Sequence, residues 1–291
     1  MKLTSLLLIC AMVLALFAGC ASQQPACDIA ATTLPVYQFT TFLVEGTGLT
    51  VTRLVTESVS CLHDYTLKVD QMRSIEKAEL VVISGAGLED FLEDALTGAQ
   101  QIVDASEGLT LLQGSHDHGH DHGHVHEEDP HIWLSPANAK IMAHNICHGL
   151  CHAYPAYTEI FEANLQDLYA RLDALQAYGQ EKLSSLSCRE LITFHDGFTY
   201  LAESFGLHIL HAVEEESGSE ASAGELIELI GMVREHNLKA IFTETNGSDA
   251  AASIIAAETG ASLYTLDMVM SGDDYFEAMY RNIDTLWEAL Q

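Results

Sequence analysis

The sequence predicts an α/β protein of two lobes, each with a parallel four-stranded sheet flanked by helices, joined by one long rigid helix. The chain has 291 residues, which is enough for two domains of about 150 residues. Short β-rich runs alternate with helical runs in two separate blocks, and this alternation is typical of parallel sheets covered on both faces. An amphipathic helical run lies between the two blocks.

The N-terminus predicts export and a lipid anchor. Lys2 precedes an apolar run over 6–18, which is too short to span a membrane and is typical of a signal peptide over 1–19. The end of this run, Gly19-Cys20, resembles the lipobox of bacterial lipoproteins, in which the cysteine is lipidated. We therefore expect Cys20 to attach the chain to the outer side of the cell membrane, or the chain to be periplasmic. The alternative is cleavage nearby, with Cys20 an ordinary thiol.

The N-terminal lobe is predicted over residues 20–154. Aliphatic and β-branched runs predict strands over 28–34, 49–55, 79–84 and 101–104. Helical periodicity predicts helices over 36–45, 70–78, 89–96 and 136–152. Along the last helix His144, His148 and His152 repeat every fourth residue. Imidazoles at that spacing can chelate a metal, although a solvated polar stripe is the preferred interpretation.

Residues 114–129 form a polar, glycine-spaced segment that predicts a loop, because it has no apolar face to bury. Its imidazoles are mostly neutral at pH 7 and can ligate metal weakly in many arrangements. The segment is therefore a candidate auxiliary metal loop, and the alternative is a solvated spacer that binds metal only incidentally. Its histidines are His116, His118, His120, His122, His124 and His126.

A connecting helix is predicted over 155–187, with apolar residues three, four and seven positions apart and Pro155 near its start. A helix of this length is expected to hold the two lobes at a nearly fixed separation. The C-terminal lobe is predicted over 188–291. Its strands are predicted over 190–194, 207–213, 239–243 and 262–266, and its helices over 198–205, 224–236, 249–259 and 274–290.

The charge balance excludes some classes of partner. The chain has 12 Lys and Arg against 42 Asp and Glu, a formal net charge of −30. Nucleic acids and anionic membrane surfaces both require a basic face, so neither is an expected partner. A cationic ligand fits this composition better.

Candidate metal ligands lie where predicted strands end, which is where doubly wound sheets place ligand sites. His63 follows the second strand, and His131 lies in the loop after the fourth. In the second lobe His195 ends the first strand and Asp267 ends the last. Three imidazoles and one carboxylate suit tetrahedral Zn²⁺, whereas Mn²⁺ prefers an oxygen-richer set.

Five stretches closely resemble the metal-binding lipoproteins of ATP-driven zinc and manganese importers, most of all the zinc-specific branch with a His-rich loop. They are SIEKAELVVISGAGLEDFLEDAL (74–96), DPHIWLSPANAKIMAHNI (129–146), LITFHDGFTYLAESFGL (191–207), LKAIFTETNGS (238–248) and LYTLD (263–267). The resemblance runs from about residue 28 to the C-terminus. It implies a monomeric, extracytoplasmic protein that is not an enzyme, captures Zn²⁺ with high affinity as transported ligand, and delivers it to the membrane permease of an ABC importer.

By this resemblance His63, His131 and His195 are the three imidazole ligands, and Asp267 is the fourth ligand or a neighbour of a ligating water. The manganese branch carries a carboxylate at the place of His195. The family commonly has prolines on both sides of a His-x-Tyr core, whereas both prolines are missing around His63. We therefore expect a less preorganised loop at this ligand.

The same residues are compatible with three further functions. Three histidines on zinc with a nearby carboxylate, Glu244, also describe a hydrolase with zinc-bound water. In the transport interpretation Glu244 supports the cleft by hydrogen bonding. Capture of manganese or another divalent metal by the same fold is the second possibility. The third is an adhesion lipoprotein that binds a host or matrix partner.

Overall fold

The N-terminal lobe contains a parallel four-stranded sheet with the strand order β2-β1-β3-β4. The computed structural model describes residues 27–57, 62, 65–114, 128–213, 221–245 and 247–291. The strands are β1 (Ile29–Ala31), β2 (Val51–Arg53), β3 (Leu80–Ile83) and β4 (Ile102–Asp104). The helices are α2 (Leu34–Leu43), α3 (Val69–Lys77), α4 (Glu93–Leu96) and α5 (Pro136–Ala153), with short 3₁₀ turns η1 (Asp90–Leu92) and η2 (Ile132–Leu134).

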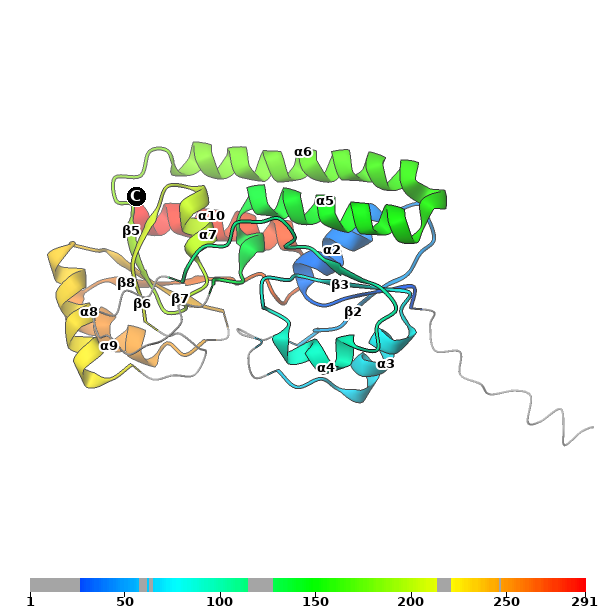
Figure 1. The fold of residues 1–291 in the computed structure, drawn as a ribbon. Helices are drawn as coiled ribbons and strands as arrows, with labels where there is room; N and C mark the ends of the chain where they lie inside the picture. The colour runs from blue at the N-terminus through cyan, green and yellow to red at the C-terminus, as the bar shows by residue number, and fades with distance from the viewer. Residues whose placement is uncertain (1–26, 58–61, 63–64, 115–127, 214–220, 246) are drawn as a thin grey trace, which may run out of the picture.

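The C-terminal lobe repeats this organisation, with a parallel sheet of order β6-β5-β7-β8. Its strands are β5 (Glu190–Thr193), β6 (His208–Ala212), β7 (Ala240–Glu244) and β8 (Ser262–Leu266). Its helices are α7 (Thr199–Ser204), α8 (Ala223–Glu235), α9 (Ala250–Thr259) and α10 (Tyr275–Leu290). In Figure 1 the two lobes lie side by side beneath a long helix.

Helices pack on both faces of each sheet, which explains why the central strands β1, β3, β5 and β7 are almost entirely buried. In β1, Ile29 packs into the large core that includes α2, α5 and α6, whereas its neighbour Ala30 packs into a smaller core with α3. In β5, Leu191 belongs to the large core, and Ile192 turns to the core under α8 and α9. Successive strand residues therefore face opposite layers of helices, as the period of two requires.

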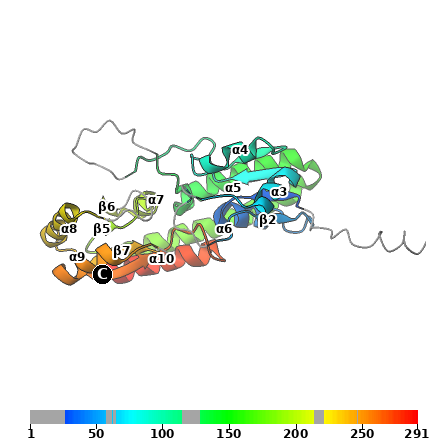
Figure 2. The ribbon, with the colours of Figure 1, turned by 90° about the horizontal axis from the view of Figure 1, so that it is seen from below.

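The long helix α6 (Thr158–Leu183) connects the lobes, after the 3₁₀ turn η3 (Pro155–Tyr157). It contacts α2 and α5 on one side and α10 of the other lobe, and Figure 2 shows α6 and α10 running alongside one another. Gly179 allows a close approach, because a Cβ there would lie 2.2 Å from Cε1 of Phe205. The glycine thus lets the second lobe pack against the helix.

The loop after β8 ties the second lobe to the first. Arg53 at the end of β2 donates from Nη1 to the Gly272 carbonyl at 2.7 Å and from Nη2 to the Met270 carbonyl at 3.2 Å. Gln38 of α2 donates to the Asp273 carbonyl and accepts from the Tyr275 amide, both at 2.6 Å. Since these bonds satisfy backbone groups between the lobes, they oppose a change in lobe separation.

The predicted fold class of two parallel sheets and a long connecting helix is confirmed. The helix predicted over 89–96 differs in detail, because it divides into η1 and the single turn α4. The signal segment 1–19 and Cys20 lie outside the described residues. Within the described ranges no helix is long and apolar enough to cross a membrane.

Candidate metal centre

Two of the predicted ligands, His131 and His195, lie side by side, one from each lobe. Their ring centroids are 5.3 Å apart, and the ring planes meet at 83°. Both residues are buried, with 3% and 2% of their surface exposed. Polar rings buried together need partners for their nitrogen atoms, and a metal ion between imidazoles is one such partner.

Asp129 holds His131 in one orientation. Its Oδ1 accepts a hydrogen bond from the His131 backbone N–H at 2.9 Å and lies 2.8 Å from the ring Nδ1. A carboxylate only accepts, so Nδ1 is the donor in this contact, and in the neutral ring Nε2 carries the lone pair. A carboxylate on the far nitrogen of a histidine is the usual arrangement behind a metal ligand.

The other ring nitrogen of His131 is the clearest sign of a missing partner. Nε2 is buried and has no hydrogen-bond partner among the described residues. Buried polar atoms are nearly always hydrogen-bonded, because a buried polar atom without a hydrogen bond destabilises the fold by about 1–3 kcal/mol. This atom therefore has the geometry and the lone pair to coordinate a metal ion that arrives from outside the protein.

His195 has a carboxylate neighbour of its own. It follows β5, and its Nδ1 lies 3.6 Å from Oε2 of Glu244, the last residue of β7. Both side chains are buried. This separation is longer than an ordinary hydrogen bond. Gly247 keeps the space beside Glu244, since a Cβ there would lie 2.5 Å from Glu244 Cγ.

Gly197 makes the approach of the two imidazoles possible. A Cβ at this position would lie 2.8 Å from Nδ1 of His131 and 2.8 Å from Cδ2 of His195. It would also lie 2.5 Å from Cε of Met268. Real Cβ atoms do not approach this closely, so any side chain at residue 197 displaces the histidines or Met268.

Trp133 fixes the segment that carries His131. Its ring packs edge-on against His131 with 5.4 Å between centroids, and its Nε1 donates to the Met268 carbonyl at 2.8 Å. The Tyr275 hydroxyl donates to the Trp133 carbonyl at 2.7 Å. Because Trp133 precedes α5 and the other two residues follow β8, these bonds position one imidazole relative to the opposite lobe.

Asp267 is placed directly after β8 and before Met268. Its Oδ1 accepts from the Val269 amide at 2.7 Å, and its Oδ2 lies 3.6 Å from Nη2 of Arg281. The turn holds Val269 at a positive φ of 59°, a backbone conformation that residues other than glycine rarely adopt. Among the described residues this carboxylate thus contacts its own turn and Arg281.

His63 lies outside the described residues, but the segments on both sides of it are held. Leu62 is buried. Tyr65 donates from its hydroxyl to Glu57 Oε2 at 2.6 Å and accepts from Gln71 Nε2 at 2.6 Å. Lys68 pairs with the same carboxylate, and the hydrogen bonds from Lys68 and Tyr65 lower the pKa of Glu57 to about 2.

The described residues therefore bring together two of the four predicted ligands. Within them no group of three or more His, Cys, Asp or Glu is close enough to hold a metal ion. The histidines from His116 to His126 lie outside the described ranges. The segment that carries them starts and ends close together, because Gln113 and Glu128 form an antiparallel bridge.

Sequence reasoning misses two residues of this centre. By sequence Asp129 belongs to the end of the His-rich loop, whereas in the structure it is buried against His131. The available signal is the spacing Asp-Pro-His before an apolar run, since an Asp two residues ahead can reach both the backbone and the ring of a histidine. Gly197 gives no comparable signal, because only the folded chain shows what surrounds it.

Known proteins resemble this chain over nearly its whole length. The family model described as "ZnuA: Zinc-uptake complex component A periplasmic" matches residues 29–289. The "High-affinity zinc uptake system protein ZnuA" of Bacillus subtilis is 30% identical over 286 residues, covering 92% of this chain and 89% of that protein.

Two solved structures resemble the fold closely. A crystal structure of ZnuA superposes with a TM-score of 0.80 at 29% identity, covering 91% of this chain and 100% of that one. A zinc-bound deletion mutant of ZnuA gives a TM-score of 0.78 at 29% identity, covering 91% and 98%. With a family model that spans nearly the whole chain, the protein belongs to the ZnuA family of zinc-uptake components.

Proposed function

We propose that this chain is an extracytoplasmic, high-affinity zinc-binding protein that delivers Zn²⁺ to the permease of an ABC importer. The single observation that carries the proposal is the buried Nε2 of His131, which has no partner in the described residues and belongs to a ring whose centroid lies 5.3 Å from that of His195. The relatives in the family are zinc-uptake components. Zinc is thus the cargo of the site rather than a cofactor for a reaction.

The proposed ligands are His63, His131, His195 and, in the fourth position, Asp267 or a water molecule beside it. The paired rings of His131 and His195 support the two central members of this set. Asp267 is supported as the fourth by its place next to Met268, whose side chain reaches the same space above Gly197. His63 belongs to the set by the family resemblance, and the described residues on either side of it are held, since Leu62 is buried and Tyr65 is hydrogen-bonded to Glu57.

Zinc is favoured over manganese by the chemistry of these side chains. Imidazole nitrogens suit Zn²⁺, whereas Mn²⁺ is bound best by carboxylates, carbonyls and water. His195 stands where the manganese branch carries a carboxylate, and its ring is buried beside a second imidazole. Capture of manganese is therefore the less favoured alternative.

Transport is also favoured over hydrolysis. A catalytic zinc needs an open coordination position and a base that can reach the zinc-bound water. Glu244 lies on the Nδ1 side of His195, the nitrogen that a ligand binding through Nε2 turns away from the metal. Glu244 thus orients a ligand rather than activating water, and we assign the chain no catalytic role.

The remaining parts of the proposal concern placement in the cell. Residues 1–19 are a signal peptide, Cys20 carries the lipid, and 20–154, 155–187 and 188–291 are the N-terminal lobe, the connecting helix and the C-terminal lobe. The protein acts as a monomer, and its partners are Zn²⁺ and the permease. The name of the family, which includes the word periplasmic, supports the extracytoplasmic location.

Zinc calorimetry on point variants tests this function. His131→Ala and His195→Ala are each expected to abolish the tight site, because each removes an imidazole that no neighbour can replace. His208→Ala is the matched control, since His208 is an exposed histidine at the start of β6, and it should leave tight binding intact. Undiminished tight binding in both site variants would refute the ligand assignment.

A further inference from the structure

A cavity lies away from the His131 and His195 pair, between the edge strand β4 and helix α5. Its volume is about 390 Å³. The residues that matter for its chemistry are Val103, Asp104, Glu107, Asn145, His148 and His152. His148 lies twelve residues beyond Pro136 in α5, which is about 18 Å along the helix at 1.5 Å per residue. The cavity is therefore separate from the proposed zinc site.

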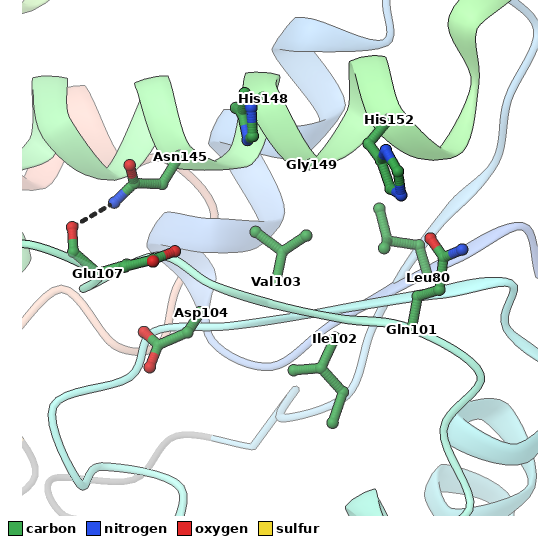
Figure 3. A pocket seen from close by; sticks show the side chains of 10 residues that line it. All are labelled: Leu80, Gln101, Ile102, Val103, Asp104, Glu107, Asn145, His148, Gly149 and His152. Carbon is green, nitrogen blue, oxygen red and sulfur yellow. Dashed lines mark hydrogen bonds between the residues drawn. The ribbon is translucent and has the colours of Figure 1, made fainter.

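Two exposed imidazoles of α5, His148 and His152, border this cavity. His148 and His152 are four residues apart, so they lie one above the other along the helix surface. In Figure 3 the His152 ring points from the helix toward Leu80, and His148 lies one turn before it on the helix, above Val103. This spacing is the one at which two helical histidines bind the same zinc ion in metalloproteases.

The walls of the cavity are held in place by packing and hydrogen bonds. A Cβ on Gly149 would lie 2.2 Å from Cγ2 of Val103, so helix and strand touch at this glycine. Asn145 Nδ2 donates to the carbonyls of Ala105 and Glu107, both at 2.9 Å. The dashed line in Figure 3 marks the second of these bonds. The two imidazoles therefore face a fixed wall.

The charge of the lining favours a cation. Asp104 and Glu107 contribute carboxylates, and among the described residues that line the cavity there is no Lys or Arg. Asp104 Oδ1 accepts from the Ser106 amide and hydroxyl at 2.8 and 2.6 Å, which fixes the carboxylate in place. A negative potential in a concave site raises the local concentration of divalent cations.

We propose that His148 and His152 form a second, weaker site for a divalent transition metal ion that prefers imidazole, such as Zn²⁺ or Cu²⁺. Hard cations such as Mg²⁺ and Ca²⁺ are not expected to bind this histidine pair, because they require oxygen donors. Within the described residues no group of three metal-ligating side chains surrounds the pair, so water completes the coordination. The site does not depend on the function proposed for the cleft.

His144 provides the matched control. It lies one turn before His148 and could form a competing pair at the same spacing, but it does not line the cavity. The proposal thus makes a choice of register: the metal binds the pair 148 and 152, not the pair 144 and 148. Two single variants, one with His144 and one with His152 replaced by the same residue, distinguish these two pairs.

The test is a Zn²⁺ titration of the full chain, uniformly ¹⁵N-labelled on histidine, continued beyond the first equivalent. The coordinating ring nitrogens of His148 and His152 are expected to shift after the tight site is full, with the signals assigned from His148→Gln and His152→Gln. Calorimetry follows the same titration. Because two imidazoles on one helix act as a chelate, loss of either should weaken this site at least about tenfold.

His144→Gln should leave both the shift and the affinity unchanged. An absent shift at His148 and His152 in the native chain overturns the proposal. Equal weakening in His144→Gln and His152→Gln also overturns it, because the cavity would then play no part. All three variants should keep the tight zinc site. A change in tight-site affinity would bear on the function proposed for the cleft and not on the site at His148 and His152.

Discussion

Asp129 Oδ1 lies 2.8 Å from Nδ1 of His131, and both side chains are buried at the junction of the two lobes. This contact leaves Nε2 of the same ring as the nitrogen with the free lone pair. One carboxylate thereby determines which ring atom of His131 is available to a metal ion.

Substitution of Asp129 tests that relationship. In Asp129→Asn the negative charge behind the ring is lost, and zinc affinity should fall about 10–100-fold, as for other carboxylates that orient ligating histidines. Asp173→Asn removes a surface carboxylate that pairs with Lys140 and should leave the affinity unchanged. Equal affinities of the two variants, measured by zinc calorimetry, would show that Asp129 does not orient the ligand.

Gly197→Ala should disturb the centre without removing any ligand. The new Cβ would lie 2.8 Å from His131 Nδ1, so the imidazoles must separate, and the free energy of unfolding should fall by about 1–3 kcal/mol. Zinc affinity should fall as well. In Gly231→Ala the added methyl meets open space on α8, and stability should rise by up to about 1 kcal/mol. Urea unfolding measures the stability of the two variants, and calorimetry measures their zinc affinity. A Gly197→Ala protein with native stability and native affinity would contradict the close contact between residue 197 and the two imidazoles.

Arg53→Gln should loosen the contact between the lobes. The guanidinium donates to the carbonyls of Met270 and Gly272, and leaving both without their donor should lower the free energy of unfolding by about 1–3 kcal/mol. Arg73 is an exposed residue of α3, and Arg73→Gln should change stability by less than about 0.5 kcal/mol. The idea fails if chemical unfolding gives the same stability for the two variants.

Glu89 should titrate near neutral pH. Burial raises its pKa to about 7 from an ordinary 4.5, despite hydrogen bonds from Thr32, Ser84 and Gly85. Because the folded-state pKa lies above the unfolded value, its contribution to stability is largest below pH 4.5 and falls as the pH rises toward 7. Carboxyl ¹³C NMR, with Glu89→Gln for assignment, measures the pKa directly, and a midpoint below pH 5 would contradict the prediction.

Deletion of residues 116–126 should remove weak zinc sites and spare the tight one. None of the six histidines of that segment is one of the predicted ligands, and the flanking residues Gln113 and Glu128 are already bridged. Replacing the six histidines by serine keeps the length and is the control for an effect of chain shortening. Loss of the tight site in both proteins would mean that the loop supplies a primary ligand.

Much of the fold is predictable because it depends on local patterns. The alternation of apolar runs and helical periodicity predicts both parallel sheets and their order along the chain, and the spacing of Phe161, Leu165, Leu168 and Leu172 predicts the connecting helix, where these residues are buried. His131 and His195 are predicted as ligands from their positions after strands, and the structure places them together. That these two histidines bind zinc, with His63 and Asp267 completing the set, stays a prediction.

The sequence by itself determined the fold class and the family, and it favoured zinc over manganese, since periodicity, motifs and the presence of imidazoles depend only on the order of residues. Only the tertiary structure decided which nitrogen of His131 is available, why residue 197 has no side chain, and that His148 and His152, rather than His144, face a cavity. The physical reason is that hydrogen bonds and close contacts depend on distances of a few ångströms between segments far apart in the chain. A local pattern carries no information about those distances.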